Sequence, residues 1–219
     1  MQRILTDTYK HKGMRKRLVS ILKEKGINDQ KILDAIGKVP RHFFLDEAFL
    51  EAAYEDQAFQ IGEGQTITQP YTVAYQTELL DISRGQKILE IGTGSGYQAS
   101  ILAELGAKIF TIERNRILRD RADKLLKEIG YFHVKTFFGD GYKGLPMYQP
   151  FDRIIVTAGS NEIPKELINQ LNVGGKLVMP IGDKNIQKMA CLIKTSETEF
   201  EINNSKSFKF VPLLPGKVN

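Results

Sequence analysis

The residues of this sequence that are best suited to chemistry gather around a glycine-rich turn. Glycines alternate with other residues over positions 92 to 96, directly after the apolar run KILEI and before a helix-like segment. Such a turn lets a ligand approach the backbone without a Cβ in the way, and it points the positive end of the helix at that ligand. A dinucleotide fingerprint, G-x-G-x-x-G, would require glycine where the chain has Tyr97. The pattern is instead E-x-G-x-G-x-G, with Glu90 at its head.

The acidic residue at the head of this turn indicates which ligand to expect. A pyrophosphate prefers positive potential, whereas Glu90 suits a ligand with cationic groups, such as the sulfonium and ammonium of S-adenosylmethionine. Two further β-like runs end in carboxylates: KIFTIE ends at Glu113, placed to meet ribose hydroxyls, and FFGDG places Asp140 near the adenine amine. Either residue alone would more often be a solvated strand end. Together with the turn, they predict one adenosine-shaped crevice at the carboxyl edge of a parallel sheet.

The elements that must position these residues form a regular series from residue 87 onward. Short β-rich runs alternate with helical periods, which predicts an α/β, Rossmann-like fold with a mostly parallel sheet and helices on both faces. Before residue 60 the pattern is helical, with no strand signal. The expected helices cover about 14–25, 29–36, a stretch within 46–54, 97–105, 115–129 and 164–171; the expected strands are KILEI, KIFTIE, HVKTFF, RIIVTA, GKLVMPIG, MACLIKT and a final run around FKFVPL.

Length and composition fit one globular domain over residues 1–219. The chain is 42% hydrophobic and 26% charged, which is ordinary for a packed core. We expect residues 1–60 to form a helical extension, 61–86 a substrate loop and helix, and 87–219 the cofactor-binding sheet. The one cysteine, Cys191, permits no intramolecular disulfide and no Cys-rich zinc site. With no signal-like or membrane-spanning apolar stretch, the expected location is the cytoplasm, away from membranes.

The positive charge and the histidines carry less information. The net charge of +5 permits weak attraction to nucleic acid but does not specify it. The densest basic cluster, residues 15–17, lies on an amphipathic helical pattern and is expected to be a solvated face, so no nucleic-acid partner is predicted. The histidines, His11, His42 and His133, are dispersed, and no metal site is expected; a structural role is expected for His42.

Beyond the glycine turn, the chain resembles the protein-L-isoaspartate O-methyltransferases, a family of S-adenosylmethionine-dependent repair enzymes. The likeness runs through nearly the whole chain in family order, and IGEGQTITQP is its most specific segment. The matching segments are VPRHFF (39–44), AYEDQAF (53–59), IGEGQTITQPYTVA (61–74), LEIGTGSGYQ (89–98), TIER (111–114), GDG (139–141), PFDRIIVTA (150–158), GGKLVMPIG (174–182) and FVPL (210–213).

The resemblance implies an activity and a set of site residues. The activity is methylation of the free α-carboxylate of L-isoaspartyl residues in proteins and peptides, after which the ester closes to a succinimide. Separately from the resemblance, we expect a monomer. Thr68 is the implied catalytic residue, and Thr68, Gln69 and Pro70 are implied for the substrate. From its charge and its place near the C-terminus, we also expect Lys209 to attract the carboxylate of the substrate. The implied cofactor residues are Gln65, Thr66, Ile67, Thr68, Glu90, Gly92, Thr93, Gly94, Ser95, Gly96, Glu113, Arg114, Asp140, Gly141 and Thr157.

The segment EGQTITQPYTVA (63–74) lacks an acid, a base or a metal ligand, and the implied reaction explains why. A carboxylate with a pKa near 4 is already nucleophilic at neutral pH, so its methylation requires positioning rather than a general base. We expect this segment to cover the methyl donor and cradle the acceptor. It departs from the family at Thr68, where serine is usual, and at Glu63, which we expect to face solvent.

Three other functions stay open at this point. Base-amine methyltransferases carry an Asn/Asp-Pro-Pro-aromatic motif where this chain has residues 156–159, VTAG, and cytosine-C5 enzymes need a Pro-Cys nucleophile, whereas Cys191 follows Ala190. An NAD-dependent dehydrogenase is opposed by Tyr97. A non-catalytic module that binds the cofactor and recognises a protein terminus is disfavoured by the glycine turn and the TITQP segment occurring together.

Overall fold

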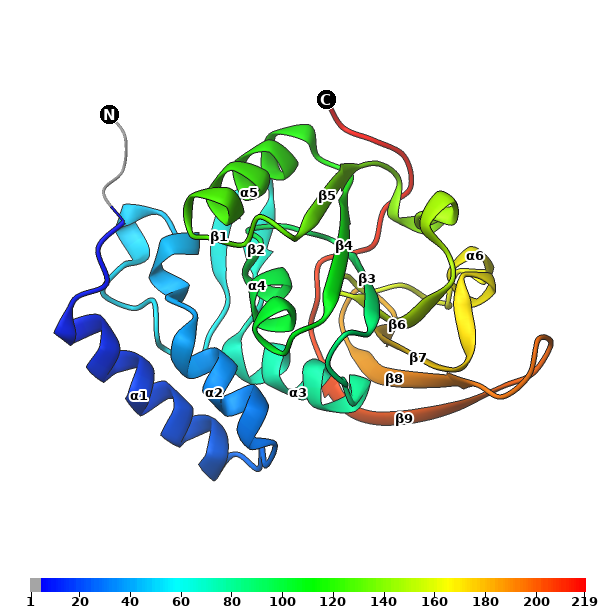
Figure 1. Ribbon diagram of the computed structural model, residues 1–219, viewed down its shortest axis with the longest axis horizontal. Coiled ribbons are helices and arrows are strands. Elements are labelled where there is room, and N and C mark those ends of the chain that lie inside the picture. Colours follow the sequence, from blue (N-terminus) through cyan, green and yellow to red (C-terminus); the bar gives the residue numbers. More distant parts are fainter. Residues whose placement is uncertain (1–4) are drawn as a thin grey trace.

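The computed structural model describes residues 5–219 and is built around one seven-stranded sheet (Figure 1). The strand order is β5-β4-β3-β6-β7-β8-β9; the first five are parallel, and β8 and β9 add antiparallel strands at one edge. The expected mostly parallel sheet is therefore confirmed. The strands are β3 (Lys87–Ile91), β4 (Lys108–Glu113), β5 (Lys135–Phe138), β6 (Phe151–Val156), β7 (Leu171–Gly182), β8 (Gln187–Lys194) and β9 (Phe200–Phe208).

Helices cover both faces of this sheet because its central strands are apolar on both sides. Alternate residues of β3 enter two different cores: Ile88 packs with the helices on one face, and Leu89 packs with the opposite layer. The first layer contains α3 (Pro70–Leu80), α4 (Tyr97–Glu104) and α5 (Arg116–Glu128). The second contains α6 (Lys165–Asn169) and two short 3₁₀ helices, Gly141–Lys143 and Pro146–Tyr148.

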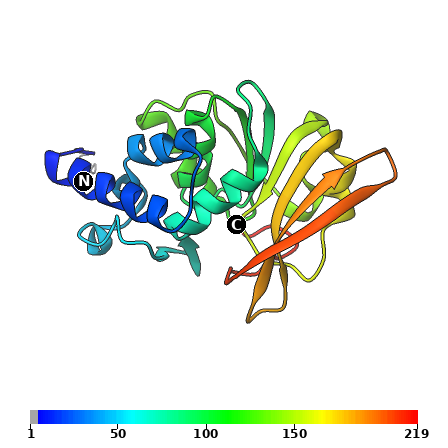
Figure 2. The ribbon, with the colours of Figure 1, turned by 90° about the horizontal axis from the view of Figure 1, so that it is seen from below.

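The first helices pack onto the sheet domain rather than standing apart (Figure 2). Helices α1 (Tyr9–Glu24) and α2 (Gln30–Lys38) share one continuous core with α4 and α5, which includes Leu18, Ile36 and Ile101. Lys16 and Arg17 are exposed, as expected for a solvated face. Arg15 is the exception: it is 5% exposed and pairs with Asp7 at 2.9 Å, so it does not belong to that face.

Two parts of the chain differ from the sequence-based expectation. Residues 59–67 form an antiparallel hairpin, β1 (Phe59–Gly62) and β2 (Gln65–Ile67), whose turn has positive φ at Glu63 and Gly64. In the 46–54 stretch only the 3₁₀ turn Glu47–Phe49 forms.

The last strand is β9, which lies before the FKFVPL run rather than around it. Its residues are mostly exposed and polar, because β9 is an edge strand with little core to cover. The sequence therefore has no apolar run from which this strand could be predicted. Pro212, which has no N–H to donate, makes a single bridge to Gly159. Among residues 5–219, no helix is long and apolar enough to cross a membrane.

Candidate functional site

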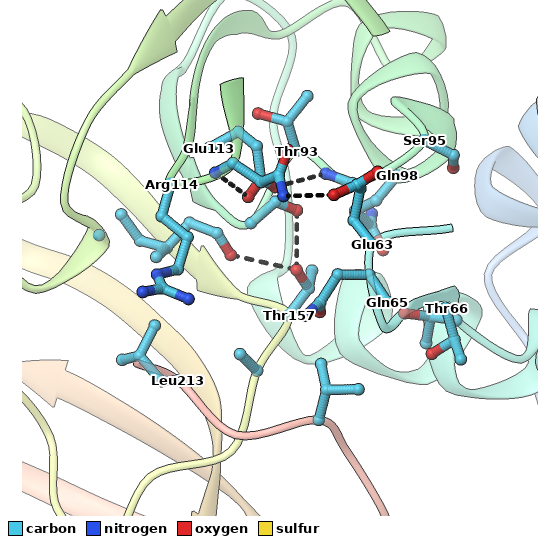
Figure 3. Close-up of a pocket in the computed structure, with 18 of the residues that line it drawn as sticks. Glu63, Gln65, Thr66, Thr93, Ser95, Gln98, Glu113, Arg114, Thr157 and Leu213 are labelled. Atoms are coloured by element: carbon cyan, nitrogen blue, oxygen red, sulfur yellow. Dashed lines mark hydrogen bonds between the residues drawn. The ribbon is translucent and has the colours of Figure 1, made fainter. Parts of the chain in front are cut away.

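One cavity lies where the sequence analysis placed the crevice, at the carboxyl ends of β3, β4 and β6 (Figure 3). The β1–β2 hairpin and the segment after β9 complete its walls. Most of the expected site residues line it together: Gln65, Thr66, Ile67, Thr68, Gly92, Thr93, Gly94, Ser95, Glu113, Arg114, Gly141 and Thr157. Six expected residues do not line it: Glu90, Gly96, Asp140, Gln69, Pro70 and Lys209.

The glycine turn forms a tight floor for this cavity. Gly92 has a φ of +96°, and a Cβ added there would lie 2.5 Å from the hydroxyl oxygen of Thr157. That hydroxyl donates to the carbonyl oxygens of Ile91 and Gly92, at 3.1 and 2.9 Å, which ties the end of β6 to the turn. Only glycine combines this backbone conformation with this approach.

Glu113 is fixed in place by backbone donors. It is 6% exposed; Oε2 accepts the N–H of Gly94 at 2.9 Å, and Oε1 accepts that of Asn115 at 3.0 Å. Each carboxylate oxygen has more than one lone pair, so both can still accept from a ligand hydroxyl. A carboxylate held in this way at the end of the second strand is suited to a ribose.

Glu90 is placed differently from its expected role. It lies on the same face of β3 as Ile88, under the helices, and is fully buried. Neither carboxyl oxygen has a hydrogen-bond partner among the described residues. Burial raises the pKa of Glu90 to about 8; the nearby Thr111 hydroxyl opposes this rise, and the negative charge of Glu113 adds to it. At neutral pH it is therefore largely protonated, behind the glycine turn rather than in the cavity.

Gln98 is a lining residue that the sequence analysis missed. This buried α4 residue donates from Nε2 to the Thr77 hydroxyl at 3.0 Å, while Oε1 has no partner within residues 5–219. A buried acceptor without a partner is costly unless a ligand supplies the donor. Together with Glu113, it makes the cavity rich in acceptors, which suits a ligand bearing an ammonium and hydroxyls.

The hairpin side of the cavity presents hydroxyls. Thr66 and Thr68 both line it, and Thr68 is half-buried. Gln69 points elsewhere, donating to the Asp56 carbonyl at 2.9 Å, and Pro70 is buried as the first residue of α3. Their positions follow from the helix start, where the chain turns away from the cavity. Lys209 is exposed and outside the lining.

Glu63 does not simply face solvent. It is exposed but reaches the rim of the cavity, where Oε2 accepts from Nδ2 of Asn115 at 3.3 Å (Figure 3). Its positive φ of 52° at the hairpin turn directs the side chain inward. The rim contact could not be read from the sequence, because it joins residues that are 52 positions apart.

Two of the histidines are not dispersed in space. The rings of His11 and His42 stack at 3.8 Å, and a carboxylate oxygen of Asp7 lies within 4.8 Å of a ring nitrogen of each. The two Asp7 oxygens are occupied by Arg15, and the His42 nitrogens face the Tyr54 hydroxyl at 2.6 Å and a backbone carbonyl. Burial lowers the pKa of His42. This cluster fastens the start of α1 to the segment that follows α2, which is a structural role.

Comparison with known proteins gives a consistent result. The family model for protein-L-isoaspartate(D-aspartate) O-methyltransferase matches residues 13–217. The chain is 52% identical over 213 residues to the protein-L-isoaspartate O-methyltransferase of Christiangramia forsetii, covering 97% of this chain and 100% of that protein. It is 54% identical over 213 residues to the enzyme of the same name from Flavobacterium psychrophilum, with the same coverage.

Solved structures share the fold. A protein-L-isoaspartate O-methyltransferase structure superposes with a TM-score of 0.82 and 30% identity over 90% of this chain, which spans 65% of that protein's length. A putative enzyme of this kind from Plasmodium falciparum, in complex with S-adenosyl-L-homocysteine, superposes with a TM-score of 0.81 at 23% identity, covering 91% of this chain and 98% of that one. The second likeness shows the fold alone.

Proposed function

The chain belongs to the protein-L-isoaspartate O-methyltransferase family, and we propose that its cavity brings the methyl group of S-adenosylmethionine to the free α-carboxylate of L-isoaspartyl residues in damaged proteins. The observation that carries this proposal is that Thr68 and the three strand ends line one cavity. The hydroxyl side suits an anionic acceptor, and the strand-end side suits an adenosine with cationic groups.

The residues present fit S-adenosylmethionine, which supplies an electrophilic methyl group when bound. Glu113 is the proposed partner of the ribose hydroxyls, since its two oxygens are held but not saturated. Gln98 Oε1, buried without a partner, is the proposed acceptor for the ammonium. The glycine turn leaves backbone exposed at the cavity floor, where no side chain blocks the approach.

Thr68 is the proposed positioning group for the acceptor. Its hydroxyl makes no hydrogen bond with another described residue, so it is available to donate to a carboxylate oxygen. No proton has to be removed from a carboxylate at neutral pH, and no base is needed near Thr68. The task of the hairpin is to hold the acceptor in line with the bond that breaks and to exclude water.

A direct test is methyl transfer to an isoaspartyl peptide, measured as methanol release on ester hydrolysis, beside the normal aspartyl twin. We expect release from the isoaspartyl peptide only. Transfer to RNA, measured in parallel, addresses the nucleic-acid alternative. Transfer to RNA and not to the peptide would overturn the proposal, whereas binding of S-adenosylhomocysteine without any transfer would favour a non-catalytic binding module.

The remaining proposals concern the state of the protein. We propose one domain over 1–219, supported by the continuous core that joins α1 and α2 to α4 and α5. We also propose a cytoplasmic location, which the buried free thiol of Cys191 supports. We propose that the protein does not bind nucleic acid, because the exposed basic residues of α1 form one helix face. We further propose that it is a monomer. Light scattering behind a sizing column tests the monomer.

A further inference from the structure

The segment after β9 forms one wall of the cavity; we call residues 209–219 the strap. It first runs beside β6, where the Gly159 N–H donates to the Val211 carbonyl at 2.8 Å and the Leu213 N–H to the Gly159 carbonyl at 2.7 Å. Val211, Leu213 and Val218 line the cavity (Figure 3). The red ribbon of Figure 1 shows the strap crossing the carboxyl edge of the sheet toward β5.

Beyond Leu213 the strap is fastened at the adenosine side of the cavity. The Val218 N–H donates to the Arg114 carbonyl at 2.7 Å, and its own carbonyl accepts from the Arg116 N–H at 2.9 Å. These bonds add a short parallel bridge, Asn115 to Val218, directly after the strand that ends in Glu113. The strap therefore covers the position proposed for the ribose.

Two side chains expected to bind cofactor, Asp140 and Arg114, make hydrogen bonds to the strap. One Asp140 oxygen accepts the Gly216 N–H at 2.9 Å, and the other accepts the Tyr142 N–H at 3.0 Å. The Arg114 guanidinium donates to the carbonyls of Pro215 and Gly216, at 3.1 and 3.4 Å. Both Asp140 oxygens and two of the Arg114 nitrogens, Nε and Nη2, are thus bonded to backbone, and three of these four bonded atoms hold the strap.

Two further contacts hold the part of the strap after Leu213: Arg116 Nε donates to Asn219 Oδ1 at 3.4 Å, and Lys217 Nζ lies 5.4 Å from the centre of the Phe138 ring. Residues 214–219 are all exposed, so apolar burial contributes little to keeping them in place. A segment with exposed hydrogen bonds and few buried contacts opens locally at low free energy. The cavity wall formed by β3, β4 and β6 is, in contrast, buried core.

We propose that residues 214–219 open to admit the cofactor and close over it, with Asp140 and Arg114 as positioning residues that act through the strap. This inference rests on the proposed function of the cavity. When closed, the strap excludes water from the adenosine side; when open, it gives the ligand its way in and out. We call the hydrogen bonds from the strap to Asp140 and Arg114 the latch. These bonds must break before the cofactor enters or leaves, so their strength sets the rates of both association and dissociation.

The test measures the rates of S-adenosylhomocysteine association and dissociation by surface plasmon resonance. Gly216→Ala perturbs the strap alone, because φ is +75° there and no atom lies within 4 Å of the added Cβ. Arg114→Met removes the guanidinium from the other side of the latch. We expect both rates to rise about fivefold in each variant, the factor for one weakened hydrogen bond, with a smaller change in Kd.

The matched control is Gly130→Ala, which places the same strain at φ +94° after α5, with open space around the Cβ and away from the cavity. It should leave both rates unchanged. A rise in dissociation alone for Arg114→Met, with Gly216→Ala like wild type, would mean that Arg114 contacts the ligand directly and would overturn the latch. If wild type binds no S-adenosylhomocysteine, the proposed function fails instead.

Hydrogen exchange of the wild-type protein gives a second measurement, which does not depend on the stability of any variant. Backbone amides at Gly216 and Val218 should exchange quickly without ligand and slowly with S-adenosylhomocysteine, while the β3 amides stay protected in both states. Equal protection of the strap with and without ligand would contradict opening.

Discussion

The two sides of the cavity differ in whether their polar side chains have hydrogen-bond partners within the protein. On the strand-end side, Glu113 accepts from two backbone amides, and the hydroxyls of Thr93 and Thr157 each have partners within the protein. On the hairpin side, Thr66 and Thr68 carry hydroxyls without partners among the described residues. Apart from Gln98 Oε1, the cofactor side is therefore preorganised by bonds within the protein, whereas the hairpin side leaves both threonine hydroxyls for a ligand to pair with.

Gly92→Ala should break the preorganised side and have the largest effect. The new Cβ would meet the Thr157 hydroxyl at 2.5 Å at a φ that alanine rarely adopts. Overpacking and backbone strain together cost about 3 kcal/mol of unfolding free energy, and cofactor affinity should fall with it. Thermal unfolding and calorimetric titration with S-adenosylhomocysteine measure both.

Gly64→Ala is the control for that variant, since φ is +67° in the hairpin turn and no atom lies within 4 Å. It should cost only about 1 kcal/mol. A second variant, Gly92→Ala with Thr157→Ala, removes the clashing oxygen and should recover part of the loss. Equal effects of Gly92→Ala and Gly64→Ala would show that the close approach at Gly92 is unimportant.

Glu90→Gln sharpens the comparison, because Glu90 is the polar side chain behind the glycine turn that lacks partners. Its pKa is about 8 in the folded protein, compared with 4.5 for an ordinary glutamate side chain. As pH rises from about 4.5 to 8, the unfolded chain releases the proton and the folded protein keeps it, so wild-type stability falls. The stability of the variant should not change in this way, so it should gain about 3.5 kcal/mol relative to wild type between pH 5 and 8.

Denaturant unfolding at pH 5, 6.5 and 8 checks this expectation. The stability difference between the variant and wild type should grow steadily with pH. A difference that stays constant over this range would mean that Glu90 is ionised throughout, with a partner that compensates its charge.

Thr68→Ala tests the hairpin side and should have a smaller effect. Loss of one hydrogen bond to a charged acceptor should lower kcat/KM for an isoaspartyl peptide about tenfold. Affinity for S-adenosylhomocysteine should hardly change, because the strand-end side holds the cofactor. Thr68→Ser keeps the hydroxyl and is the control; if Thr68→Ala turned over like wild type, Thr68 would have no part in positioning the acceptor.

Glu63→Gln should have the smallest effect. The side chain is exposed at the rim, where screened repulsion of an acidic peptide is weak, and KM should fall about twofold at low salt. The effect should disappear at high salt. A change in kcat instead would place Glu63 at the reacting groups.

The parts of the fold that could be predicted from the sequence are those in which apolar residues recur at a regular spacing. The apolar runs before Gly92 and Glu113 and the alternation of strands and helices located the sheet and its carboxyl edge. The face of the sheet on which Glu90 lies could not be predicted. Because β3 is buried on both faces, its sequence has no alternation of apolar and polar residues that would distinguish one face from the other.

The rest of the site depends on contacts between distant residues. Gln98 is one polar residue in a helix, and only the placement of α4 behind the turn makes it part of the cavity. Asp140 reaches Gly216 across 76 positions, and no local pattern reveals that pairing. Motif reasoning therefore assigned its carboxylate to the ligand.

The open edge of the sheet at β9 has a consequence for a protein that handles damaged chains. Such clients expose unpaired strands, and an apolar edge would capture them indiscriminately and seed aggregation. The outer strand exposes Phe200 and Ile202 at its start, but the residues after them include Asn203, Asn204 and Lys206, all exposed. Amide and ammonium groups along this edge disfavour stable strand pairing, so that contact with a misfolded client is transient.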